Sequence, residues 1–137
     1  MRACRMVVLG LLVLMIVTGC AMRPKGTPGP ACPAIDAAVT IDQPSERLEM
    51  LEEIATRRDL SENDQIYLVN AICGSGFSAG RANALVALLE NPCCVEPAWE
   101  HVREKLKVTR LLGSDKRRVI DALLKRAAAS QPAADED

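Results

Sequence analysis

Aromatic residues are almost missing from this chain of 137 residues, which contains one Tyr, one Phe and one Trp. Few aromatic rings leave little that could stack on bases or sugars. The formal net charge of −1 does not fit a generally basic nucleic-acid binder. The single histidine, His101, excludes any mechanism that needs two imidazoles. We therefore expect no nucleic-acid partner.

Alternating β-branched runs are also missing, so the sequence predicts no β-strands. Apolar residues instead recur at helical spacing in five segments, which predicts an all-α fold. Each segment opens at a residue typical of helix N-termini: Pro44, Ser61, Ser78, Pro97 and Ser114. Ser61 and Asp64 have the spacing of a capping box. The expected buried positions are Leu48, Leu51, Ile54, Ala55, Ile66, Val69, Ile72, Cys73, Ala82, Leu85, Leu88, Leu89, Trp99, Val102, Leu106, Val119, Ile120, Leu123, Leu124 and Ala127.

An internal repeat of two helices is visible when the chain is shifted along itself. A shift of 34 residues places Leu51, Ile54, Leu60 and Leu68 on Leu85, Leu88, Cys94 and Val102. A further shift of 35 places Leu85, Leu88 and Leu89 on Ile120, Leu123 and Leu124. Units of this length resemble HEAT-type repeats, and the tetratricopeptide pattern is absent. The resemblance implies a short, HEAT-like α-solenoid of about five helices; an irregular helical bundle is the alternative.

The N-terminus has the pattern of an export signal. Arg2 and Arg5 precede an uncharged apolar run over residues 6–17. Twelve helical residues rise about 18 Å, which is too short to cross the hydrocarbon core of a bilayer. The run therefore favours a signal peptide over a membrane span.

The run ends at Val17-Thr18-Gly19-Cys20, which resembles the lipobox of bacterial lipoproteins at every position. The resemblance implies a signal peptide over residues 1–19, and a diacylglyceryl thioether with an N-acyl chain on Cys20. Ala21 follows the cysteine instead of an Asp, which leans towards the outer membrane, facing the periplasm, over the inner one. An ordinary secretory signal with an incidental cysteine is the alternative.

After Cys20, the sequence divides into three parts. Residues 20–43 are rich in Pro and Gly and predict an extended tether. Residues 44–129 form the expected helical repeat domain. Residues 130–137 predict an acidic, solvated tail.

Four cysteines remain for the domain: Cys32, Cys73, Cys93 and Cys94. They include no CxxC motif, and the usual zinc-ligand spacings are missing, so we expect no metal and no cofactor beyond the lipid. Buried thiols or one structural disulfide are both compatible with an exported compartment. A bridge from Cys73 to Cys93 or Cys94 is disfavoured, because the expected third helix would separate them by about 20 Å.

Charge is unevenly distributed along the chain. Residues 36–100 carry 12 acidic and 4 basic side chains, whereas residues 101–126 carry 3 acidic and 9 basic ones. If the last two helices form a hairpin, six bases gather at one end and offer a surface to an anionic partner: Lys105, Lys107, Arg110, Lys116, Arg117 and Arg118. Lipid headgroups, a cell-wall polymer and an acidic protein are the candidates, and a merely solvated face is the alternative. His101 lies off the apolar stripe and is expected at the surface.

The residues favour a non-enzymatic binding protein, because they include no recognisable nucleophile motif. The resulting prediction is a membrane-anchored envelope lipoprotein whose helical domain acts as a protein–protein interaction or scaffold module. A small-molecule substrate is not expected. The alternatives are an assembly factor that resembles the pilotin lipoproteins in size, lipobox and helicity, and a thiol-dependent enzyme.

Overall fold

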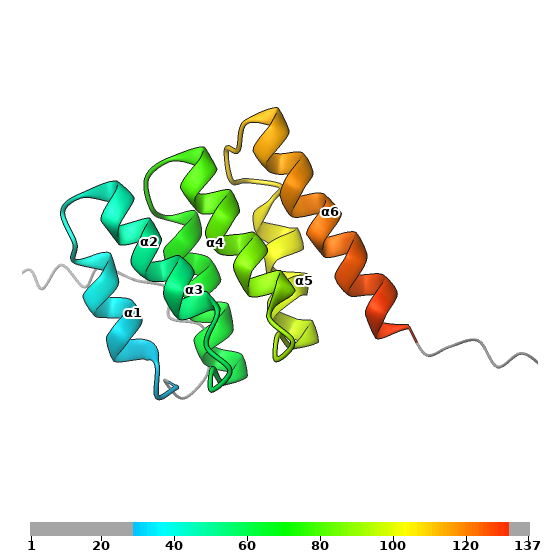
Figure 1. The fold of residues 1–137 in the computed structure, drawn as a ribbon, viewed down its shortest axis with the longest axis horizontal. Helices are drawn as coiled ribbons and strands as arrows, with labels where there is room; N and C mark the ends of the chain where they lie inside the picture. The colour runs from blue at the N-terminus through cyan, green and yellow to red at the C-terminus, as the bar shows by residue number, and fades with distance from the viewer. Residues whose placement is uncertain (1–28, 132–137) are drawn as a thin grey trace, which may run out of the picture.

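The computed structural model describes residues 29–131, which contain six helices and no strand. The helices are α1 (Cys32–Val39), α2 (Pro44–Ala55), α3 (Glu62–Cys73), α4 (Ser78–Glu90), α5 (Glu96–Lys105) and α6 (Gly113–Ser130). The predicted all-α class is confirmed (Figure 1).

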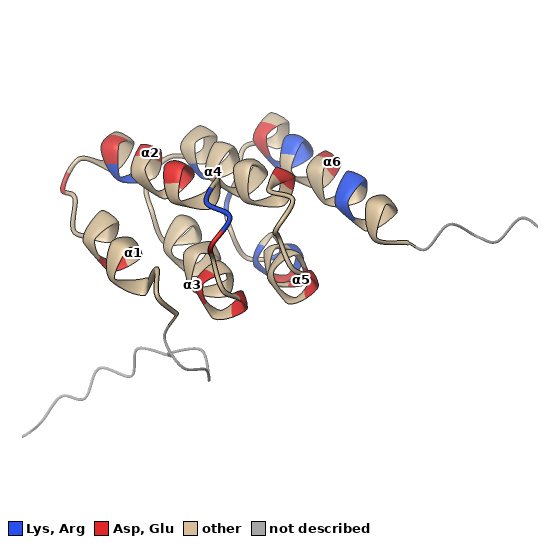
Figure 2. Ribbon diagram, turned by 60° about the horizontal axis from the view of Figure 1, so that its bottom comes forward, with Lys and Arg blue, Asp and Glu red and all other residues tan. Residues whose placement is uncertain are grey.

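Successive helix pairs stack side by side in two layers. Helices α1, α3 and α5 form one layer, and α2, α4 and α6 form the other (Figures 1 and 2). Within a layer the helices run parallel, since each loop between paired helices lies at the same end of the domain. We call this end, with the loops over residues 40–43, 74–77 and 106–112, the loop end. The stacking is the arrangement expected of a short α-solenoid.

Helix α1 corrects the predicted tether, which extended to residue 43. Ile35 and Ala38 of α1 are fully buried against the core, and Ala31 before the helix is buried too. Helix α1 has only eight residues, which is too few to show an apolar periodicity in the sequence. The prolines in and before it favoured an extended linker instead. Pro33 is nevertheless compatible with a helix, because it occupies the first turn, where no N–H donor is needed. The folded domain therefore begins near Ala31 rather than at Pro44.

The core lies between the two layers and centres on α4. Leu51, Leu68, Leu85 and Leu88 are fully buried, and most of the predicted inward positions are buried with them. Positions Ile66, Cys73, Trp99 and Ala127 are only partly buried. Leu68 was not on the predicted stripe of its helix, although the repeat had aligned it with Val102.

Two predicted core residues of α6 are wrong: Ile120 is 39% exposed and Leu124 is 64% exposed. The buried residues Val119, Ala122 and Leu123 lie 34 positions after Leu85, Leu88 and Leu89, not 35. An offset of one residue turns a helix by about 100°, which moves Ile120 and Leu124 out of the core.

Two of the predicted helix caps are also wrong. The Ser61–Asp64 capping box is present as predicted. Phe77 and Leu112, however, precede α4 and α6, so Ser78 and Ser114 lie inside the helices. The Ser78 hydroxyl has a tertiary role instead: it donates to Asp115 Oδ2 at 2.6 Å and accepts from the Leu112 N–H at 2.8 Å.

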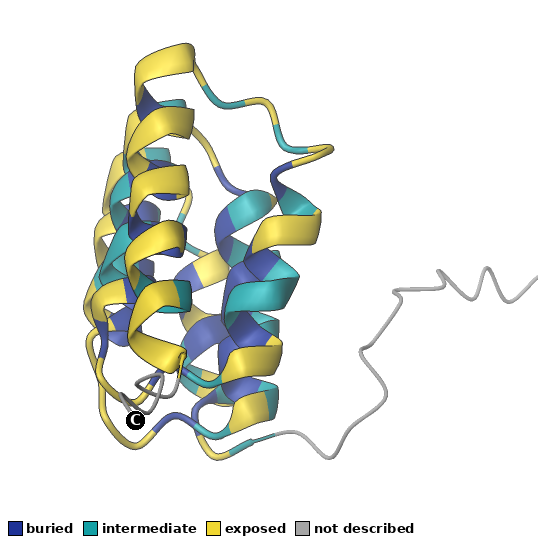
Figure 3. Ribbon diagram, turned by 90° about the vertical axis from the view of Figure 1, so that its right-hand side faces the viewer, coloured by how far each residue is buried: buried dark blue, intermediate teal, exposed yellow. Residues whose placement is uncertain are grey.

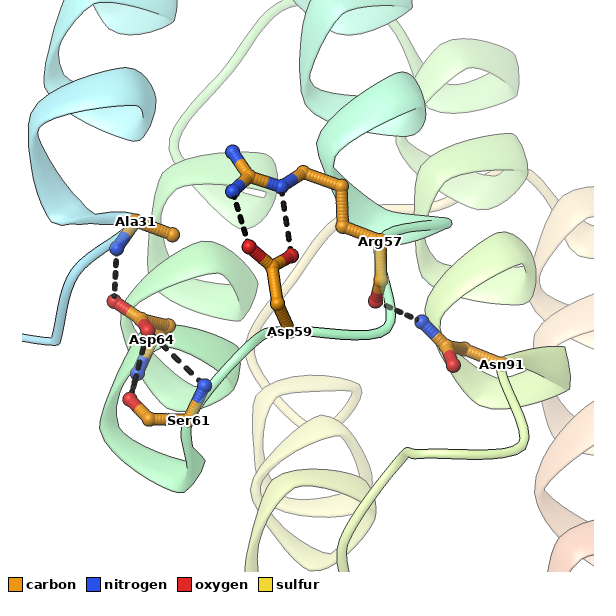
Figure 4. Close-up of polar contacts among 6 residues, drawn as sticks. All are labelled: Ala31, Arg57, Asp59, Ser61, Asp64 and Asn91. Carbon is orange, nitrogen blue, oxygen red and sulfur yellow. Dashed lines mark hydrogen bonds and ion pairs between the residues drawn. The ribbon is translucent and has the colours of Figure 1, made fainter.

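Polar contacts between hairpins repeat with the period of the sequence. Tyr67 donates to Asp36, and 34 positions later His101 pairs with Asn70 across 3.0 Å. At the end opposite the loop end, the Asn91 amide donates to the Arg57 carbonyl at 2.6 Å (Figure 4) and to the Ala55 carbonyl at 2.9 Å. The 34-residue repeat in the sequence is therefore a repeat in space as well.

Candidate interaction surface at the loop end

The six predicted basic residues do lie at one end of the domain. Lys105 ends α5, Lys107 and Arg110 lie in the following loop, and Lys116, Arg117 and Arg118 lie in the first turns of α6. All except Lys105 are exposed. The turn between α5 and α6 joins the two groups, as the hairpin prediction required.

Only part of this charge is paired within the domain. Lys107 Nζ lies 2.8 Å from Glu104 and Arg118 lies 4.0 Å from Asp115. Arg118 also donates to Asn83 Oδ1 at 2.9 Å. Cations near the N-terminus of a helix are disfavoured by the helix dipole. Stabilisation of α6 therefore does not explain why Lys116 and Arg117 lie in its first two turns.

Three large apolar side chains share the loop end with these bases, and the sequence pattern did not predict them there. Phe77 is 62% exposed, Val108 78% and Leu112 67%. The bond between Ser78 and the Leu112 N–H brings the two loops together, and the loop end is largely exposed in Figure 3. Phe77 lies more than 30 positions before Val108 and Leu112 in the sequence, so only the folded arrangement groups them. We call the residues Phe77, Lys107, Val108, Arg110, Leu112, Lys116 and Arg117 the basic-apolar surface.

The four cysteines of the described residues are free thiols. Cys94 is buried, Cys32 and Cys73 are half-buried, and Cys93 is exposed. Cys73 precedes the continuous helix α4 and Cys94 follows it, which separates them as predicted. Burial raises the pKa of Cys32, Cys73 and Cys94 above that of a free thiol, which is opposite to the activation of a nucleophile.

His101 is half-buried, which places it deeper than the predicted surface position. Desolvation, and secondarily the charge of Lys105, lowers the pKa of His101 below its usual value. Its contact with Asn70 is a contact between α5 and α3. Within residues 29–131, no three His, Cys, Asp or Glu side chains are grouped so as to hold a metal ion.

The predicted signal peptide and Cys20 lie outside the described residues, as does most of the predicted acidic tail. Among the described helices, none has the length and apolar character needed to cross a membrane. Comparison of the chain with protein-family models, curated proteins and solved structures gives no match.

Proposed function

We propose that this chain is a lipid-anchored protein of the bacterial envelope. It is attached through Cys20, and its helical domain binds a partner. The lipobox-like sequence Val17-Thr18-Gly19-Cys20, placed directly after an apolar run, carries the anchoring part of the proposal. Only a thiol supplies the sulfur for the thioether. Two or three acyl chains anchor a protein durably, whereas one does not.

Replacement of the Cys20 thiol tests the anchor. Cys20→Ser should abolish metabolic labelling of the chain by a fatty-acid probe and release it from the membrane fraction. Cys32→Ser, a matched control in the folded domain, should keep both properties. A labelled Cys20→Ser chain, or an unlabelled wild-type chain, would show that the lipoprotein assignment is wrong.

We propose further that the domain binds an envelope protein with an acidic and partly apolar face. The observation that carries this is the basic-apolar surface, where exposed Phe77, Val108 and Leu112 lie among bases that α6 does not need. Protein interfaces combine apolar side chains at their centre with charges at the rim that select and orient the partner. An acidic protein satisfies both parts of this surface.

Neutralising the basic rim should weaken this binding without unfolding the domain. The full chain with Lys107, Arg110, Lys116 and Arg117 all changed to Gln should lose roughly tenfold or more in affinity for the captured partner, because each charge near an anionic surface contributes about 1 kcal/mol. Binding of the wild type should weaken as salt rises. The measurement is quantitative capture from solubilised envelope membranes, followed by titration with the identified protein.

A matched variant changes exposed bases elsewhere, Arg58→Gln with Lys125→Gln, and should bind the partner as the wild type does. Anionic vesicles and isolated cell wall are tested in parallel. Wild-type binding to either of these alone, or equal binding by both variants, would contradict an acidic protein as the partner of this surface.

A further inference from the structure

The last helix of the stack leaves one side uncovered. Arg118 of α6 donates to Asn83 on α4, and Arg126 donates to the Pro92 and Cys94 carbonyls in the loop that follows α4. These arginines mark the side of α6 that faces α4. Ile120 follows Arg118 by two positions and Leu124 precedes Arg126 by two, so each apolar residue lies about 160° around the helix from the arginine next to it in this pairing.

This uncovered side is apolar. Ile120 and Leu124 are 39% and 64% exposed, and the partly buried Ala127 continues their row along the helix. Helix α6 packs against α4 and makes little contact with α5 (Figure 1), so these side chains are covered only in part by the rest of residues 29–131. We call the row Ile120, Leu124 and Ala127 the trailing edge.

The opposite end of the stack carries an apolar groove. The groove has a volume of about 480 Å³ and lies between α1 and α2, with Ala34, Ala37, Ile41, Met50 and Ile54 among its lining residues. Met50 is 42% exposed. Its counterpart 34 positions later, Ala84, is fully buried within the packed middle of the stack. We call this groove the leading edge.

The two edges differ in charge. Glu53 lines the leading edge, and Glu46 and Glu49 are exposed on the same helix; Arg57, the base in the lining, is paired with Asp59. Exposed bases in the first two turns of α6, Lys116 and Arg117, flank the trailing edge. Helices of one layer run parallel (Figure 2). Continuing the stack with a second chain would therefore set the N-terminal turn of its α2, with Glu46, beside Lys116 and Arg117.

From these observations we infer that the chain self-associates head to tail, with the trailing edge of one copy packed into the leading edge of the next. A second copy of the chain offers the trailing edge both an apolar groove and an acidic rim. The two edges would then pack with the same spacing as neighbouring hairpins inside the domain. The contact is heterologous: each copy has one of each edge, so copies join in a row and not as a two-fold pair. This inference does not rest on the proposed partner or on the lipid anchor.

The test uses full-length chains that carry two different affinity tags, expressed together and extracted in detergent. Capture through one tag should recover the other. Leu124→Arg on both chains should reduce recovery roughly tenfold or more, because it buries an unpaired charge in the contact. Met50→Arg on both chains should do the same.

Combining the two variants separates a head-to-tail contact from association through any other surface. A Leu124→Arg chain keeps its groove and a Met50→Arg chain keeps its α6, so the mixed pair should recover near wild-type capture through one intact contact. Recovery also shows that both variant chains are folded. Cys93→Arg on both chains is the matched control, since Cys93 is exposed but lies in the loop between α4 and α5, away from both edges, and it should leave capture unchanged.

Three outcomes would overturn the inference. Absence of capture between wild-type chains would mean that another segment or protein covers the edges. Undiminished capture between Leu124→Arg chains would mean that the copies meet elsewhere or only share a micelle. A mixed pair that fails to associate, while each variant keeps the wild-type thermal midpoint, would exclude pairing of these two edges.

Discussion

Truncation of Leu85 to Ala is expected to lower the free energy of unfolding by about 2–5 kcal/mol. Leu85 is fully buried at the middle of α4, the helix that packs against α2, α3 and α6. Its neighbours belong to both layers and are held by other helices, so they cannot collapse into the space that the side chain leaves. A domain of this size has a total stability of roughly 5–15 kcal/mol, so the loss is a large share of it.

The matched control makes the same chemical change at an exposed position. Leu124→Ala should shift the unfolding midpoint little, because that side chain is 64% exposed in a single copy. Denaturant unfolding of both variants, followed by circular dichroism, measures the difference. Equal midpoints for Leu85→Ala and wild type would show that α4 is not central to the fold.

Local determinants of the fold could be predicted from the sequence, whereas determinants that join distant segments could not. The capping box of Ser61 and Asp64 is a contact over three residues, and the pattern alone predicted it. Helix α1 has no comparable local signal. Its two buried side chains, Ile35 and Ala38, become stabilising only when α2 and α3 provide the surface they cover.

The register of α6 shows a second limit. Two successive leucines, Leu123 and Leu124, both fit an apolar stripe, and a one-residue offset decides which of them faces the core. Tertiary bonds fix that choice: Arg118 to Asn83, and Arg126 to the loop after α4. These bonds join residues more than 30 positions apart, and the local sequence of α6 does not predict them.

The candidate surface was predictable only in its charge. Two short runs of bases on either side of a turn must lie at the same end of the domain if the flanking helices are antiparallel, and they do. The apolar residues among them come from two different loops. Phe77 and Leu112 are neighbours because the Ser78 hydroxyl accepts from the Leu112 N–H. Ser78 and Leu112 are one repeat of 34 residues apart, so the repeat places the two helix starts side by side but does not predict this bond.

The carboxylate of Asp64 fastens α1 to the rest of the domain. It is fully buried and accepts from the Ala31 N–H at 3.1 Å, the Ser61 N–H at 3.0 Å and the Ser61 hydroxyl at 2.7 Å (Figure 4). One oxygen thus completes the cap of α3, and the other holds the chain just before α1. Gly29 packs so closely over this carboxylate that a side chain there would collide with it.

Asp64→Ala should therefore destabilise the domain by about 2–4 kcal/mol, since it leaves the buried Ala31 N–H and the half-buried Ser61 N–H without acceptors and removes half of the capping box of α3. The loss should be greatest at α1, which is short and reaches the core through few side chains. Hydrogen exchange should report faster exchange of the amides in residues 31–39 than in α4. Denaturant unfolding measures the total effect.

Asp59→Ala is the matched control for Asp64→Ala. Asp59 bonds Arg57 through both carboxylate oxygens, at 2.9 and 2.6 Å, but both side chains are exposed (Figure 4). A hydrogen bond from the Arg57 guanidinium lowers the pKa of Asp59, yet water screens this exposed ion pair, so its loss should change the stability little. Comparable losses for Asp59→Ala and Asp64→Ala, or unchanged exchange in α1 when Asp64 is removed, would contradict the role of Asp64. The expected contrast follows from burial, because only the buried carboxylate leaves donors that water cannot reach.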